Sequence, residues 1–145
     1  MNTFLNLALG TVMILATVAI HTFGLIYVTH AMRWVTSHIR IHGHRNRILA
    51  MYTVILGVFA VLTAEVWLWA LCYLAINFLD DLPTALYFSI STFSTLGYGD
   101  VLPHPEWRLL GGLEGITGFL MIGWSTAYLI AAGIRVGPFR SGEHF

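Results

Sequence analysis

The chain has 145 residues, of which 57% are hydrophobic and only 10% are charged, and its mean hydropathy is +0.76. A soluble domain usually carries about 25% charged residues, so this deficit indicates a protein that is surrounded by lipid. The formal net charge is zero, which argues against nucleic acid or another polyanion as a partner. The single cysteine, Cys72, cannot form an intramolecular disulfide, and we expect it to pack as a small hydrophobic residue.

The first apolar segment lies within residues 1–30 and runs from about Phe4 to Thr29. It lacks the positively charged start and the small-residue cleavage site of a signal peptide, so we predict a retained transmembrane helix. Its only ionisable residue is His21. Counted from the inner ends of the two spans, His21 lies about one helix pitch or more below Glu65, so we expect it to contact a neighbouring helix without pairing with Glu65.

Two further segments are long enough to cross a bilayer, which takes about 20 apolar residues. Residues 48–79 contain Glu65, and residues 107–134 contain Glu114. Carboxyl groups inside membrane spans are costly and normally face protein or water. We therefore predict two more transmembrane helices, each with a buried carboxyl group.

A shorter apolar piece, residues 83–94, lies between these two spans. It is too short to cross a bilayer. Asp80 and Asp81 precede it, and either can cap the N-terminus of a helix that has Pro83 in its first turn. The pattern predicts a re-entrant helix that enters and leaves on the same side.

The distribution of arginine predicts the orientation, because the chain has no lysine. Six of the seven arginines lie in residues 31–47 or 135–145, and only Arg108 lies near the short helix. By the positive-inside rule the linker 31–47 and the short tail 135–145 face the cytoplasm, and the N-terminus lies outside, in a cell (inner) membrane. Four aromatic residues are expected to form an outer interfacial belt: Trp67, Trp69, Tyr73 and Trp107.

The short helix runs into the sequence STFSTLGYGD, residues 91–100, in which Gly97 and Gly99 flank Tyr98. Backbone without regular hydrogen bonds is tolerated at membrane depth only where protein buries it or where it lines a water-filled cavity. These residues therefore have to be packed by protein, hydrated, or both.

A short helix followed by Thr-Leu-Gly-Tyr-Gly-Asp between two full spans resembles the pore domain of potassium channels, over residues 48–134. The resemblance implies an outer helix (48–79), a pore helix (83–94), a selectivity filter (95–100) and an inner helix (107–134). The expected fold is an all-α membrane protein with three transmembrane helices, the extra one being N-terminal, plus the re-entrant pore helix and filter loop. One chain supplies one such loop, and four surround an ion, so a homotetramer in membrane lipid is expected.

By this resemblance, potassium ions shed their water and are bound by backbone carbonyl oxygens and one threonine hydroxyl. The implied potassium-binding residues are Thr95, Leu96, Gly97 and Tyr98, with Gly99 closing the outer mouth and Asp100 beside it. Glycine adopts the required backbone angles at low cost. The implied function is passive, selective conduction of potassium, with the ion as permeant ligand and no cofactor. The sequence shows no nucleophile–base pair of the kind that would indicate an enzyme.

The chain departs from the common potassium-channel pattern at three positions. Leu96 stands where valine or isoleucine is usual, while Ser91 and Phe88 stand where many members carry glutamate and tryptophan. The usual carboxyl and indole contacts to Asp100 are therefore absent, and another group has to hold it.

We hypothesise that Glu114, Glu65 or both bond behind the filter, together with hydroxyl-bearing residues such as Ser91 and Thr92. Both carboxyls lie at about the depth of the short helix, at about 1.5 Å per helical residue. The alternative is that each is a structural carboxyl far from the filter.

Small residues recur along the third span, where they allow helix backbones to approach closely. Gly115, Gly118 and Gly123 are candidates for a gating hinge, because glycines are places where a long helix bends easily. Close packing without a hinge is the equally weighted alternative.

The linker region combines four arginines with His30, His38, His42 and His44. Contact with anionic lipid headgroups is the first interpretation, and pH sensing and metal binding are alternatives. The gating stimulus and any regulatory partner are not indicated by the sequence. Two rival functions stay open: a weakly selective cation channel and a non-conducting accessory membrane subunit.

Overall fold

The computed structural model describes residues 3–38, 44–102 and 104–136, without the side chains of residues 38, 44–46 and 136. Within these ranges all regular structure is helical. The elements are α1 (Thr3–His38), α2 (His44–Ala75), α3 (Leu82–Phe93), the single 3-10 turn η1 (Pro105–Trp107) and α4 (Arg108–Val136).

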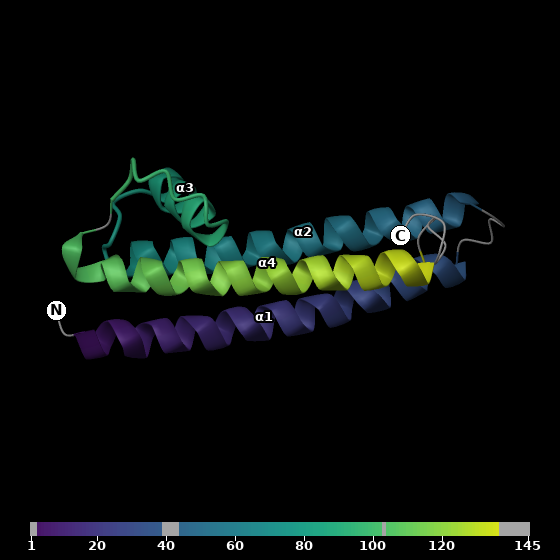
Figure 1. Ribbon diagram of the computed structural model, residues 1–145, viewed down its shortest axis with the longest axis horizontal. Helices are drawn as coiled ribbons and strands as arrows, with labels where there is room; N and C mark the ends of the chain where they lie inside the picture. The colour runs from purple at the N-terminus through teal and green to yellow at the C-terminus, as the bar shows by residue number, and fades with distance from the viewer. Residues whose placement is uncertain (1–2, 39–43, 103, 137–145) are drawn as a thin grey trace.

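The three long helices lie side by side, and the short α3 is tilted against one end of the bundle (Figure 1). Both α1 and α3 pack on α2 and α4, from opposite sides. Three helical stretches are long and apolar enough to cross a membrane: Thr3–Ser37, Arg47–Ala75 and Pro105–Arg135. The chain is therefore a multi-pass membrane protein. With 12 residues, α3 is too short to be a further span.

The first two long helices are longer at their linker ends than the sequence indicated. Helix α1 continues to His38 and α2 begins at His44, so much of the predicted linker 31–47 is helical. His42 lies outside the described residues, as do the side chains of His38 and His44, so the predicted lipid, pH-sensing and metal roles of this histidine group stay predictions. His30 donates from Nδ1 to the carbonyl oxygen of Ile26 on its own helix, at 2.8 Å.

Helix α2 ends at Ala75 rather than at residue 79, because Asn77 has a φ of 53°. This left-handed conformation stops a helix, and the flanking hydrogen bonds form a Schellman motif: Phe78 N to Tyr73 O at 2.9 Å and Asn77 N to Leu74 O at 3.1 Å. The rings of Phe78 and Tyr73 stack with centroids 4.5 Å apart. The capping contact therefore turns the chain back into the bundle toward α3.

Helix α3 begins as its sequence predicted, with Asp81 as the N-cap and proline in the first turn. The carboxylate of Asp81 accepts from the backbone N of Thr84 at 2.9 Å and from its hydroxyl at 2.7 Å. The Thr84 backbone bond, followed by its hydroxyl bond, lowers the pKa of Asp81. Aspartate at this position also interacts favourably with the helix dipole, so the start of α3 is stabilised locally.

The α1–α2 pair packs through reciprocal glycine contacts. A Cβ atom at Gly24 would lie 2.5 Å from Val61, and one at Gly57 would lie 2.6 Å from Val28. Each glycine of one helix therefore receives a valine of the other, which is how small residues let helices approach in lipid. These contacts set the register in which the polar residues of α1 meet α2.

The buried side chains form two clusters, one at each end of the bundle. The cluster nearer α3 contains Met13, Trp69, Tyr73, Phe78, Phe88, Phe93, Leu110 and Met121, and the other contains Leu25, Val28, Val54, Val58, Val61 and Ala132. Trp69 and Tyr73 are completely buried, so their predicted place in an interfacial belt is wrong. Their polar atoms are satisfied by other helices instead of by headgroups.

Candidate functional site

The backbone after α3 alternates in handedness. Thr95, Gly97 and Gly99 have φ angles of 62°, 57° and 75°. Among the described non-glycine residues, only Asn77 and Thr95 have a positive φ, so Leu96 and Tyr98 do not. Such alternation in the sign of φ favours a chain whose successive N–H groups point to one side and whose successive carbonyl groups point to the other.

Two hydrogen bonds tie this segment to the end of α3. The N–H group of Thr95 donates to Thr92 O at 3.0 Å, and that of Gly97 donates to Ser91 O at 3.1 Å. No peptide bond in the described chain is cis, so the carbonyl of Leu96 points opposite to the N–H of Gly97. The carbonyl oxygen of Leu96 therefore faces away from α3.

The side chains of this segment are uncovered in the single chain. Leu96 is 57% exposed and Tyr98 is 70% exposed, and the whole stretch from Ser94 to Asp100 is classed as exposed. The backbone of this stretch is irregular as well as exposed, and lipid cannot supply hydrogen-bond partners to its polar groups.

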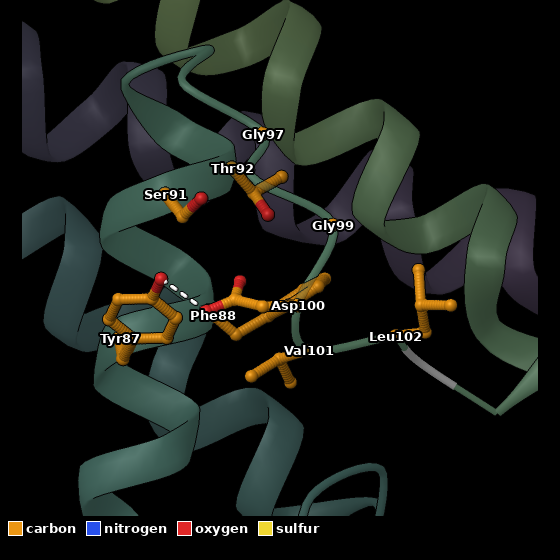
Figure 2. A pocket seen from close by; sticks show the side chains of 9 residues that line it. All are labelled: Tyr87, Phe88, Ser91, Thr92, Gly97, Gly99, Asp100, Val101 and Leu102. Carbon is orange, nitrogen blue, oxygen red and sulfur yellow. Dashed lines mark hydrogen bonds between the residues drawn. The ribbon is translucent and has the colours of Figure 1, made fainter.

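Asp100 is held by Tyr87 of α3. The Tyr87 hydroxyl donates to Asp100 Oδ2 at 2.6 Å (Figure 2). This bond lowers the pKa of Asp100 and raises the pKa of Tyr87, because it favours the ionised carboxylate and the protonated phenol. The sequence indicated that Ser91 and Phe88 cannot supply the usual contacts and led us to Glu114 and Glu65 instead, so Tyr87, next to Phe88, was overlooked. Phe88 itself is buried against the rings of Tyr73 and Phe78.

A cavity of about 150 Å³ lies between α3 and the residues that follow it (Figure 2). It is lined by Tyr87, Phe88, Ser91, Thr92, Gly97, Gly99, Asp100, Val101 and Leu102. The cavity occupies the space behind the segment, on the side opposite to the Leu96 carbonyl. Of the predicted support residues, Ser91 and Thr92 line this cavity and bind the segment through their backbone carbonyls.

Glu114 of α4 joins three helices. Its Oε1 accepts from the Ser89 hydroxyl of α3 at 2.5 Å, and its Oε2 accepts from the Tyr73 hydroxyl of α2. Ser89 Oγ also lies 3.0 Å from the carbonyl oxygen of Val66 on α2. All three side chains in the network, those of Glu114, Ser89 and Tyr73, are fully buried. The carboxyl is therefore hydrogen-bonded to α3 about one turn before its C-terminal end.

Glu65 has a different partner from the one expected. Its Oε1 lies 2.8 Å from Nδ1 of His21 on α1, and both side chains are fully buried. The predicted direct support of the segment after α3 by Glu65 is therefore corrected, and so is the prediction that His21 does not pair with it. The depth estimate failed because it ended the first helix at Thr29, whereas α1 continues nine residues further to His38.

The three candidate hinge glycines differ in what surrounds them. A Cβ atom at Gly118 would overlap the backbone carbonyl of Phe93, at the end of α3. One at Gly115 would make ordinary contact with Thr92 O at 3.6 Å, and one at Gly123 would meet nothing within 4 Å. Gly118 is thus required for close packing of α4 on α3, while the hinge role stays a prediction.

Replacing Gly118 with alanine is expected to displace the end of α3 from α4 and to lower the stability of the purified protein. The backbone of Phe93 cannot move aside as a flexible side chain does. We therefore expect the free energy of unfolding to fall by about 1–3 kcal/mol, as at other overpacked positions. Thermal unfolding in detergent measures it. The matched control is Gly115→Ala on the same helix, which should unfold at nearly the wild-type temperature; equal effects of the two substitutions would contradict this packing role.

Comparison with known families gives one match. A family whose description is ion channel matches residues 52–135, from α2 through α3 and the segment after it to the end of α4. No curated protein and no solved structure matches the chain. The match points to a channel rather than an enzyme.

The matched region contains the tethered segment at residues 95–99, its cavity and the Glu114 network, and it leaves α1 outside. It covers more than half of the chain. This membrane protein, with three helices long enough to span a bilayer, therefore belongs to the ion channel family.

Proposed function

We propose that the protein is a potassium-selective channel in which dehydrated K⁺ passes through the carbonyl oxygens of residues 95–98, with Gly99 at the outer mouth. The observation that carries the proposal is the bond from Gly97 N–H to Ser91 O. It draws the N–H side of the segment toward α3, so that the carbonyl of Leu96 faces away from α3. A carbonyl oxygen placed there has no partner in lipid, whereas a permeating cation is a suitable one.

The alternating φ angles extend this argument along the segment. Positive φ at Thr95, Gly97 and Gly99 supports a row of carbonyls on one side, which is what replacing the hydration shell of K⁺ requires. Glycine occupies two of these three positions, where it adopts the left-handed conformation at low cost. The C-terminal end of α3 adds a partial negative charge that favours a cation nearby.

A homotetramer completes the site in this proposal. One chain supplies one row of carbonyls, and the exposure of Leu96 and Tyr98 leaves apolar surface for neighbouring copies to cover. The arginine distribution supports a cytoplasmic C-terminus and an outward N-terminus in a cell membrane. The Tyr87–Asp100 bond and the Glu114 network then act as supports behind the filter.

A weakly selective cation channel is the second candidate. The cavity of about 150 Å³ behind the segment favours it, because the glutamate common at the position of Ser91 is absent and the space is left open. A filter with open space behind it can widen to accept a second ion type. Relative permeability to Na⁺ separates the two candidates.

The function is tested by ion flux from liposomes that contain the purified protein. We expect potassium flux that barium blocks, with sodium flux at least tenfold lower. Gly97→Ala should abolish selective flux, because alanine in the left-handed region costs about 1–2 kcal/mol per chain. Gly112→Ala is the control, since a Cβ atom meets nothing within 4 Å at either position and only Gly97 has a positive φ. Absence of flux from wild-type tetramers, or equal K⁺ and Na⁺ flux, would refute potassium selectivity.

The Tyr87–Asp100 bond predicts how acid affects conduction. The bond lowers the pKa of Asp100, so the carboxylate and its bond are present at neutral pH and are lost only as pH falls through that lowered value. Tyr87→Phe removes the donor, and the pKa of Asp100 moves up toward its usual range. Acid should therefore reduce potassium current at a higher pH in Tyr87→Phe than in wild type. Current measured against external pH tests this, with the exposed Tyr52→Phe as control; identical midpoints would exclude the role.

The Glu114 network predicts a coupling between stability and selectivity. Tyr73→Phe preserves the ring but removes one of the two donors to the buried carboxyl, which is expected to cost about 1–3 kcal/mol. Because Glu114 also binds Ser89 of α3, we expect a lower unfolding temperature together with a lower K⁺/Na⁺ permeability ratio. Ser89→Ala should act in the same direction. If these variants unfold at a lower temperature but keep the wild-type K⁺/Na⁺ permeability ratio, the network contributes to stability and not to selectivity.

A further inference from the structure

Helix α1 lies outside the part of the chain that matches the ion channel family, yet it packs beside α4 (Figure 1). At the end near α3, Asn6 Nδ2 donates to the carbonyl oxygen of Glu106 on η1, the turn that leads into α4, at 2.9 Å. Gly10 packs closely against Leu113 of α4. Further along, the ring of His21 packs against that of Trp124, with centroids 5.0 Å apart. Helix α1 therefore packs on α4 through specific side-chain contacts.

The last of these contacts is a hydrogen bond between Thr29 and Tyr128, whose hydroxyl oxygens lie 2.8 Å apart. Thr29 has one hydroxyl proton, and its oxygen also lies 2.8 Å from the Leu25 carbonyl, which can only accept. The Tyr128 hydroxyl is therefore the donor to Thr29. This places a directional bond between α1 and the C-terminal half of α4, one helical turn beyond Trp124.

On its other side α1 is anchored to α2. His21 and Glu65 form a fully buried pair, and Trp69 Nε1 donates to the Thr17 hydroxyl at 3.1 Å. Separating His21 from Glu65 would leave a buried polar or charged group without its partner, which is costly inside a membrane span. The α1–α2 contact is consequently the harder one to break, and the α1–α4 contact is the weaker one.

Gly123 lies directly before Trp124, and a Cβ atom there would meet nothing within 4 Å in the chain. A bend of α4 at this point moves Trp124 and Tyr128 relative to α1, which stays fixed to α2. Such a bend breaks the Thr29–Tyr128 bond and shifts the His21–Trp124 ring contact. The geometry points to α1 as a built-in latch on α4, which stabilises one position of the C-terminal half of α4 and so sets the ratio of open to closed channels. This inference rests on the proposed channel function.

Single-channel recording of the full chain in planar bilayers, with potassium on both sides, tests the latch. Thr29→Val and Tyr128→Phe each remove the same bond, so each should change the open-to-closed ratio by about two- to tenfold, in the same direction. The double variant should change it no further than either single variant. Thr22→Val is the matched control, because the Thr22 hydroxyl donates to the Val18 carbonyl of its own helix at 2.7 Å and, among the described residues, to no other helix.

The outcomes are distinct. An unchanged ratio in both Thr29→Val and Tyr128→Phe overturns the latch while conduction by the wild type leaves the channel proposal intact. A lower unfolding temperature with an unchanged ratio also overturns it, because α1 is then only a structural support. If Thr29→Val prevents assembly, Tyr128→Phe, which keeps the ring, decides the question alone. A wild-type protein that conducts no ions refutes the channel proposal and the latch together.

Discussion

A carboxyl group inside lipid must find its hydrogen-bond donors within the protein, and Glu114 finds them on two other helices. Tyr73 of α2 and Ser89 of α3 both donate to it, and no side chain of this trio is exposed. The short α3 cannot span the membrane, so it depends on such contacts to stay at its depth. The position of everything that follows α3, including residues 95–99, therefore depends on this one buried group.

The second constraint acts on the backbone after α3. Its N–H groups at Thr95 and Gly97 are satisfied by carbonyls at the end of α3, which leaves the Leu96 carbonyl directed outward. The described part of the chain thus supplies hydrogen-bond partners to the N–H side of the segment and none to the carbonyl of Leu96. Potassium ions and neighbouring copies of the chain would together supply them, which is why the proposed function and the proposed assembly depend on each other.

Helix α1 adds a third layer of polar contacts. Its buried face presents Asn6, Thr17 and His21 at steps of about one or more helical turns, and each has a partner on another element. In lipid, packing and hydrogen bonds hold helices together because apolar side chains gain little by leaving lipid tails. A helix held by several such bonds has a defined rotation and depth relative to its neighbours.

The sequence by itself determined the features that depend on neighbouring residues. Hydropathy located the three spans, aspartate and proline located the start of α3, and the order Thr-Leu-Gly-Tyr-Gly located the segment whose φ angles alternate. Only the tertiary structure decided the pairings His21–Glu65, Tyr73–Glu114 and Tyr87–Asp100. The first two join residues more than forty positions apart. They depend on the axial register of packed helices, which differs from the predicted register because α1 extends nine residues beyond its predicted apolar segment. The third joins residues on either side of an irregular segment. Composition does not specify the course of irregular backbone, so the sequence could not predict this pairing.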